Sequence, residues 1–379
     1  MLQNLFFKTF FIASVLVFAP VIASAQEVHQ DFEERVQATV LSVEDSYERT
    51  ITGTGASTTV QELRIELLEG ERAGEIVGLT SEKVVLSEGD TIYVNRIIDI
   101  SGNEYITFAD FERRPVLFVV MALFVLMLLV FSGWQGVRAL LSLFGSIGAI
   151  FFLLIPALLA GYNPALTSVA IAAIVMCFVL FGTHGINPRT LIAFAGTYTA
   201  IAITGVIAYF SVDLMRLTGF SSDASVYLNF ATNGQLDLAG LLLGSIIIGI
   251  LGVLDDVSIT QASVVQELKR ANAELKFLDL YQGAIRVGKD HIGSLVNTLA
   301  LAYVGVSLPL ILLYAKTESS FMLSLNQEVI AAEVIRIIIG SIGLILAVPL
   351  TTLVAAWWFG GREVVDSDEV ATHCHSHEH

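Results

Sequence analysis

Seven apolar segments fill most of the chain after residue 115, and they constrain the fold more than any other feature. A helix of roughly 20 apolar residues crosses the hydrocarbon core of a bilayer. The composition agrees, because 55% of the 379 residues are hydrophobic and only 15% are charged. The sequence therefore predicts an α-helical polytopic membrane protein with about seven transmembrane helices, at Val116–Phe131, Val137–Leu159, Ala165–Gly182, Thr190–Phe210, Leu238–Leu254, Ile292–Tyr314 and Val334–Phe359.

Residues 1–25 have the features of a signal peptide. Lys8 precedes an apolar core from Phe10 to Ile22, and Ala23-Ser24-Ala25 has the small-residue pattern of a cleavage site. The alternative is an uncleaved first membrane anchor. Either interpretation places the following residues outside the cytoplasm.

Residues 26–115 are predicted to form an exported β-rich domain. Short alternating segments separated by glycines favour a small antiparallel barrel of OB-like topology. The domain carries nineteen Asp and Glu against eight Lys and Arg, a net charge of −11. These acids could gather cations, but a charged face on an exported domain usually serves solvation. The expected strands are Val36–Val43, Gln61–Leu68, Glu75–Thr80, Thr91–Ile98 and Glu104–Phe111.

The distribution of basic residues orients the predicted helices 116–360. With the β-domain outside, the loops after the first, third and fifth helices and the tail 361–379 are cytoplasmic. These parts carry eight Lys and Arg, whereas the external loops and helix ends after the first helix carry three. This bias agrees with the positive-inside rule, so the C-terminus is expected in the cytoplasm. The cytoplasmic segment 258–290 has apolar residues at near-helical steps and is predicted to be an amphipathic helix.

Two adjacent acids follow the charge-free run Leu238–Leu254. A helix places Asp256 on one face with small and polar residues, and such a face lets another helix approach closely. An Asp at mid-bilayer costs at least about 2.5 kcal/mol, so Asp255 and Asp256 are expected to face the bundle interior or a water-filled cavity. The alternative is that both acids lie beyond the membrane surface and are hydrated. The shared face comprises Ser245, Gly249, Gly252, Asp256, Thr260, Ser263 and Glu267.

Several polar residues are candidates to line a path beside this acid pair. Asn297 must find a partner if it is buried in hydrocarbon, so it is expected to point inward. His184 lies in a cytoplasmic turn and is a candidate proton or metal ligand, although a loop histidine is often only hydrated. The remaining candidates are Thr260, His291 and Thr298.

The C-terminal tail is rich in metal-ligating side chains. Imidazole and thiolate groups suit zinc, nickel, copper or cobalt. Their spacing is not that of a folded zinc site, so the tail is either a weak collector of divalent metal or an idle hydrophilic end. No other cofactor is expected, and the two cysteines of the chain do not suggest a disulfide framework. The candidate ligands are His373, Cys374, His375, His377 and His379.

Composition and motifs exclude several classes of function. A net charge of −16 argues against nucleic acid as a partner. No P-loop is present, and neighbouring acids on one helix point about 100° apart, unlike the facing carboxylates of an aspartyl protease. We therefore predict no enzyme but a transporter or permease for a cation, proton-coupled or small solute, with Asp255 or Asp256 as coupling group. The alternative is a non-transporting scaffold or sensor that relays an external signal to segment 258–290. Homo-oligomerisation is left open.

Four motifs resemble those of the YibE/F-like family of bacterial multi-pass membrane proteins. The resemblance runs from about Arg35 to Trp358, and the Leu-Asp-Asp segment is its most specific part. It implies a bacterial, membrane-embedded protein. The resemblance predicts the architecture of the chain, but it implies no activity or substrate. The His-rich tail is not part of the family pattern. The motifs are Gly70-Glu71-Arg72-Ala73-Gly74-Glu75, Arg113-Arg114-Pro115, Thr183-His184-Gly185 and Gly252-Val253-Leu254-Asp255-Asp256-Val257-Ser258-Ile259-Thr260-Gln261.

Overall fold

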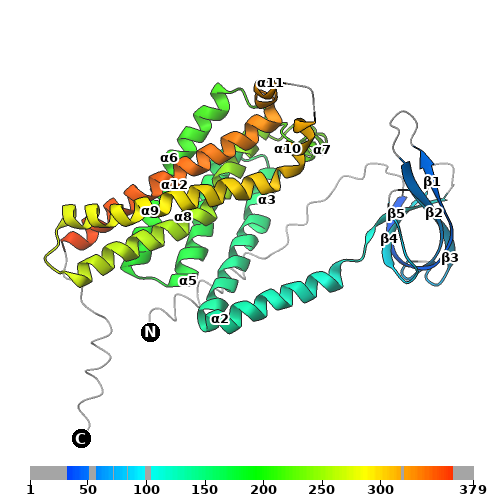
Figure 1. Ribbon diagram of the computed structural model, residues 1–379, viewed down its shortest axis with the longest axis horizontal. Helices are drawn as coiled ribbons and strands as arrows, with labels where there is room; N and C mark the ends of the chain where they lie inside the picture. The colour runs from blue at the N-terminus through cyan, green and yellow to red at the C-terminus, as the bar shows by residue number, and fades with distance from the viewer. Residues whose placement is uncertain are drawn as a thin grey trace, which may run out of the picture. The chain divides into compact units, whose positions relative to one another are not determined.

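The computed structural model describes residues 32–50, 57–70, 72–82, 84–98, 104–316 and 320–361. The predicted signal peptide and the metal-ligating tail lie outside these residues. The chain separates into two compact units. One holds the β-sheet and the chain up to Val130, and the other holds the helices from Phe131 onward (Figure 1). Each unit is described by itself.

The first unit is a five-stranded antiparallel sheet in the order β3-β2-β1-β4-β5. Strand β1 lies at its centre, where Ala38 pairs with Leu67 of β2 on one side and with Ile92 of β4 on the other. All five predicted strands are confirmed, although β1 extends well beyond its predicted ends. The strands are β1 (Phe32–Thr50), β2 (Ser57–Leu67), β3 (Ile76–Ser81), β4 (Thr91–Ile98) and β5 (Glu104–Phe111).

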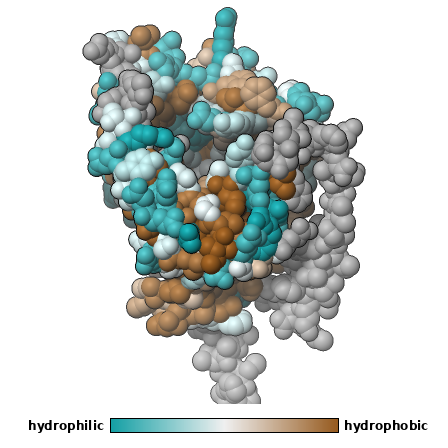
Figure 2. All heavy atoms as spheres, turned by 90° about the vertical axis from the view of Figure 1, so that its right-hand side faces the viewer, coloured by the Kyte–Doolittle hydropathy of each residue, from teal (hydrophilic) through white to brown (hydrophobic). Residues whose placement is uncertain are grey.

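The sheet is curved around its own apolar core. Register shifts in β1 between Val40 and Ser42 and between Val43 and Asp45 bend this strand. The edge strands β3 and β5 also contact each other. Both hydrophilic and hydrophobic residues cover the face shown in Figure 2. The core consists of Val36, Ala38, Val40, Leu63, Ile65, Leu67, Leu79, Leu86, Ile92 and Val94.

The rest of the described chain is almost entirely helical. Long helices form where the sequence has uninterrupted apolar runs, and asparagine or aspartate caps the starts of three of them. The elements are α2 (Arg114–Ala149), η1 (Ile150–Leu154), α3 (Ile155–Leu159), α4 (Pro164–Met176), η2 (Cys177–Phe181), α5 (Gly182–His184), α6 (Pro188–Leu214), α7 (Asp223–Ala231), α8 (Leu238–Ala271), α9 (Phe277–Val306), α10 (Leu308–Ala315), α11 (Phe321–Leu325) and α12 (Glu328–Gly360). The elements η1 and η2 are π-helical.

Five helical stretches of the described residues are long and apolar enough to cross a membrane, or six if α9 and α10 form one bent span. The prediction of seven spans is not confirmed. The first two predicted segments form one stretch, Arg114–Leu159, because the chain stays helical on both sides of Gly133. Gly133 itself is non-helical, with φ 52° and ψ −131°. The bend of 67° between α9 and α10 lies just before Pro309, which has no N–H for the helix ladder.

Helix α8 continues for more than four turns beyond the predicted end at Leu254. The segment 258–290 is helical, but it is not the single amphipathic helix that was predicted. A turn at residues 272–276 divides it between α8 and α9. The ammonium group of Lys269 stabilises this turn by donating to the carbonyl oxygens of Ala273 at 2.6 Å and Leu275 at 2.9 Å. Lys269 is buried for this reason, although the amphipathic pattern placed it on the polar face.

Helix α8 is the centre of the helical unit. It contacts α4, α6, α9 and α12, and α6 and α9 also pack against α12. Figure 1 shows α8, α9 and α12 running side by side. The core between them is apolar and well buried, with Ile201 of α6, Ile246 and Ile250 of α8 and Leu344 of α12 at its centre. Many large apolar side chains cover the outside of the helices, which suits a lipid environment.

Candidate functional site

The acid pair lies in the second half of α8, and the two side chains have different surroundings. Asp255 is only 6% exposed, whereas Asp256 is exposed. The difference follows from helix geometry, because adjacent residues point about 100° apart. One carboxylate oxygen of Asp255 accepts the backbone N–H of Asp256 at 2.8 Å. Within the described chain, no side chain from another helix pairs with Asp255.

The acid pair lies level with the π-helical turn η2. Helices α4 and α8 run in step, since Gly240 lies against Pro164 and Gly244 against Ser168. The same pairing of positions, continued along both helices, places Asp255 and Asp256 level with η2. This turn follows α4 directly and contacts α8. π-Helical turns interrupt the regular hydrogen-bond ladder and are frequent at functional sites. One carbonyl oxygen of η2, that of Phe178, accepts the hydroxyl of Ser142 at 2.8 Å.

His184 lies at the end of α5. It is half-buried and lies within electrostatic range of both Asp256 and Arg189. The turn that follows is fixed by Asn187, whose amide donates to the carbonyl oxygen of His184 at 3.0 Å. The Asn187 side chain also accepts the Thr190 N–H at 2.9 Å and so caps α6. His184 and Asp256, two of the predicted candidates, therefore lie within electrostatic range of each other, on α5 and α8.

Buried hydroxyl and amide groups join α8 to α12 on the C-terminal side of the acid pair. Thr351 donates to the hydroxyl of Ser258 at 3.1 Å, and the Thr352 hydroxyl lies 3.3 Å from the amide oxygen of Gln261. All four side chains are at most 5% exposed. The sequence analysis missed this contact, because uncharged Ser, Thr and Gln in an apolar run give no signal of their partner.

Helix α6 adds three fully buried threonines at seven-residue intervals, Thr190, Thr197 and Thr204. Thr197 donates to the backbone carbonyl of Ala193 at 2.8 Å. The hydroxyls of Thr190 and Thr204 have no hydrogen-bond partner among the described residues. The interval of seven could have identified this stripe in the sequence, since residues two turns apart share a face.

The structure does not bring the other predicted lining residues to Asp255. His291, Asn297 and Thr298 are exposed on α9, and Thr298 donates to the backbone of its own helix. The expectation that Asn297 points inward is therefore wrong for this chain. The reason is that α9 packs through a different face, which carries Leu280, Ala284, Gly288 and Leu299.

The predicted small-residue face of α8 is largely uncovered. Ser245, Gly249, Gly252 and Asp256 are exposed, and Thr260 is half-buried. The hydroxyl of Tyr303 approaches this face closely, since a Cβ at Gly249 would lie 2.5 Å from it. The expectation that this face packs against another helix along its length is thus not met, and Asp255 is the buried acid instead.

A second polar cluster joins α8, α9 and α12 near the start of α12. Arg336 forms an ion pair with Glu333, whose other oxygen accepts the Ser307 hydroxyl at 3.2 Å. The guanidinium also lies 3.4 Å from the hydroxyl of Ser245. A pair that neutralises itself in this way serves to hold helices together.

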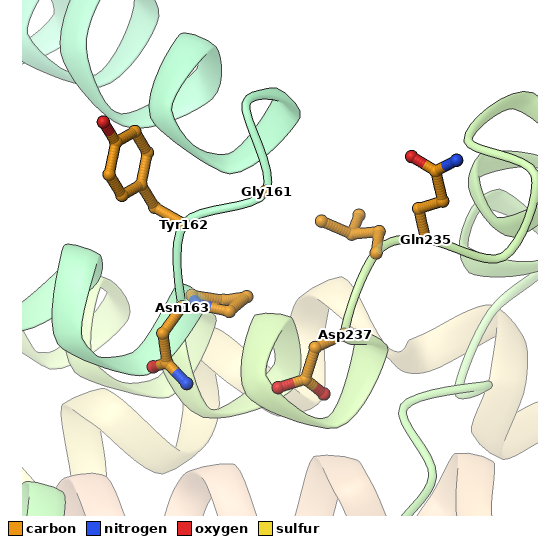
Figure 3. Close-up of a pocket in the computed structure, with 7 residues that line it drawn as sticks. Gly161, Tyr162, Asn163, Gln235 and Asp237 are labelled. Carbon is orange, nitrogen blue, oxygen red and sulfur yellow. The ribbon is translucent and has the colours of Figure 1, made fainter.

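A cleft of about 240 Å³ lies between the loop before α4 and the loop before α8. Figure 3 shows the Asn163 and Asp237 side chains on one side of these loops, with Tyr162 and Gln235 pointing away. Asn163 and Asp237 cap the two helices by accepting backbone N–H groups at 3.0 and 2.9 Å. Asp255 lies eighteen residues further along α8, about 27 Å away at 1.5 Å per residue, so the cleft is separate from the acid pair.

The described residues contain no group of three or more His, Cys, Asp or Glu that could hold a metal ion. Asp255, Asp256 and His184 do not form such a group. The predicted ligands His373 to His379 lie outside the described part of the chain, as do any contacts that they make.

Long apolar helices packed around a common core define the class: this is an α-helical membrane protein. The family model for the YibE/F-like protein matches residues 120–361. The chain belongs to this family. Neither a curated protein nor a solved structure matches the chain.

Proposed function

We propose that this protein is a transporter or permease of the bacterial cytoplasmic membrane for a cation, proton-coupled or small solute. The path runs beside α8, between the helices that contact it, and Asp255 is the coupling or binding group. The observation that carries the proposal is the burial of Asp255 in an apolar helix bundle without a cationic partner among the described residues. An ionisable residue in such a position is costly and marks an ion or substrate pathway.

The surrounding residues support a path at this point of the bundle. Asp256 and His184 form the exposed side of the site, and the π-helical turn η2 lies level with it. Ser258 and Thr351 continue the polar surroundings of Asp255 toward the end of α12. Asn297, Thr298 and His291 lie on the exposed face of α9, so they are assigned no part in this path.

The proposed orientation places the β-sheet unit outside and the α8–α9 turn in the cytoplasm. Arg114–Leu159 would be about 69 Å long as a continuous helix of 46 residues, more than twice the roughly 30 Å hydrocarbon core. A break at Gly133 lets this stretch make two passes, which gives seven spans with the bent α9–α10 pair. The curved sheet, with contact between β3 and β5, suits a small OB-like barrel.

Flux into proteoliposomes tests the proposal. Vesicles containing the purified chain are challenged separately with gradients of protons, Na⁺, K⁺ and Mg²⁺, with dyes for each ion inside. We expect a flux that Asp255→Asn reduces at least about tenfold, as removal of a group worth 1.4 kcal/mol or more would do. Asp290→Asn is the matched control, because Asp290 is an exposed acid in the middle of α9.

An unchanged flux in Asp255→Asn would remove the coupling role of this residue. Absence of flux for every ion, together with co-purification of a stable partner protein, would favour the scaffold or sensor alternative. In that case the α8–α9 turn would be the part expected to contact the partner.

A further inference from the structure

We propose that Asp255 binds a proton and exchanges it with the adjacent aqueous phase through Asp256 and His184. The inference deepens the proposed function by naming the coupling ion. Its transport part rests on that function, whereas binding of a proton by Asp255 does not. The geometry behind it is a buried acid directly before an exposed one on the same helix. Asp255 is 6% exposed, Asp256 at the next position of α8 is exposed, and the half-buried His184 lies within electrostatic range of Asp256.

The charges around Asp255 leave its carboxylate without compensation. On its own helix the neighbouring charge is that of Asp256, which is also negative. On the α4–α5 side the titratable groups are Cys177 and His184, and at the start of α6 Arg189 lies near His184. Residues 337–360 of α12 contain no titratable group. The basic residues Arg286 and Lys289 of α9 lie nearer the start of that helix, and Lys289 is exposed.

A buried carboxylate in these surroundings must acquire a positive partner or lose its charge. A divalent metal needs a shell of six or more oxygens or a cluster of ligating side chains, and no such cluster occurs among the described residues. One oxygen of Asp255 already accepts the Asp256 N–H, and the Ser258 hydroxyl already accepts that of Thr351. A proton needs only one free carboxylate oxygen. The free oxygen of Asp255 therefore suits a proton better than a divalent metal.

The exposed pair supplies a path for that proton. The imidazolium of His184 gives its N–H proton through water to the carboxylate of Asp256, and the resulting carboxylic acid gives its proton through water to the carboxylate of Asp255. Asp256 is then a carboxylate again, and uptake of one proton from water by the neutral imidazole restores the imidazolium of His184. The net change is one proton moved from water to Asp255, with no change of oxidation state.

Infrared difference spectroscopy of the full chain in lipid vesicles measures the bound proton directly. A protonated carboxylic acid has a C=O stretching band that a carboxylate lacks. At neutral pH we expect such a band, its shift in D₂O, and its loss in Asp255→Asn. Persistence of the full band in Asp255→Asn, or its absence from the unaltered chain, would overturn the proposal.

The rate of exchange tests the relay. After rapid mixing into D₂O, the band should shift more slowly in His184→Gln and Asp256→Asn by about two orders of magnitude, the lower end of what a positioned proton donor contributes. The matched controls are Asp290→Asn and His291→Gln, an exposed acid and histidine on α9 that should leave the rate unchanged. Equal rates in all four variants would overturn the relay.

Two further measurements separate the possible failures. Circular dichroism and gel filtration identify any variant that fails to fold, and Asp255→Glu, which keeps the carboxyl group, should retain a band. A protonated Asp255 without flux of any ion would sustain the proton site and contradict the transport proposal. Loss of the band on addition of Na⁺ at constant pH would show that sodium replaces the proton, which contradicts the inference but not the transport function.

Discussion

The hydroxyls of Ser258 and Thr351 lie 3.1 Å apart and connect α8 to α12 in the fully buried centre of the bundle. Thr351 donates and Ser258 accepts. The contact lies three residues from Asp255 along α8, so it helps to fix the helix face that carries this acid. Its strength can be measured without knowledge of the substrate.

Thr351→Val should lower the stability of the protein by about 1 kcal/mol, within the range measured for hydrogen bonds between membrane helices. The change keeps the shape of the side chain and removes the donor. Ser258→Ala and the double variant complete a cycle, in which the two changes together should cost less than the sum of the single changes. Thermal unfolding in detergent supplies the values, and strict additivity would show that the contact contributes nothing.

Gly196→Ala should destabilise the bundle by about 1 to 3 kcal/mol, the usual cost of overpacking. A Cβ at this position would lie 2.7 Å from the Cα of Thr351, so α6 and α12 would have to move apart. Gly205→Ala, on the same helix, is the matched control, since its Cβ would meet Ile247 at an ordinary 3.8 Å. Unfolding temperatures in detergent compare the two variants. Similar values would mean that the close approach at Gly196 is not needed.

Lys269→Met should loosen the turn between α8 and α9. Methionine keeps the aliphatic volume but leaves the carbonyl oxygens of Ala273 and Leu275 without their donor. We expect faster amide hydrogen exchange at residues 272–276, measured by mass spectrometry. Lys289→Met removes an exposed lysine of α9 and should leave the exchange of this turn unchanged. An unchanged rate in Lys269→Met would contradict the role given to the ammonium group.

The β-sheet unit should lose stability in acid through Glu112. The guanidinium of Arg114 and the hydroxyl of Tyr93 hold the pKa of Glu112 at about 2, below its ordinary 4.5. Because the folded-state pKa is lowered, this contribution to stability is present above pH 4.5 and is lost as pH falls toward 2. Glu112→Gln should therefore reduce the loss of exchange protection in β4 and β5 over this interval, whereas Glu88→Gln, an exposed control, should not.

The sequence predicted the strands and the apolar helices well, because alternation and long apolar runs are local properties. It could not decide the number of spans, since that depends on whether the helix continues through Gly133. It identified the acid pair but assigned the wrong face of α8 to the interior. Small residues at helical spacing define a face, yet only the packed neighbours decide whether that face is covered, and here Asp255 lies on the covered side.

Lys269 and Asn297 show the same limit of prediction from sequence, one for a residue expected at the surface and the other for a residue expected inside. A lysine in an amphipathic pattern is expected at the surface, but the carbonyl oxygens of the following turn give it a buried place. An asparagine in an apolar run is expected inside, but α9 turns a different face to the bundle. Both outcomes depend on how consecutive helices are joined and rotated, which periodicity alone does not contain.

The seven-residue interval of the α6 threonines sets a limit on how this helix can change length. Insertion of a single residue between Thr190 and Thr204 would rotate one hydroxyl away from the others by about 100° and move an aliphatic or aromatic side chain into its place. A substitution on α6 changes the contacts of one position, whereas an insertion or deletion displaces every residue that follows it. The spacing of these residues, more than the identity of any one of them, is therefore what variation in this helix must preserve.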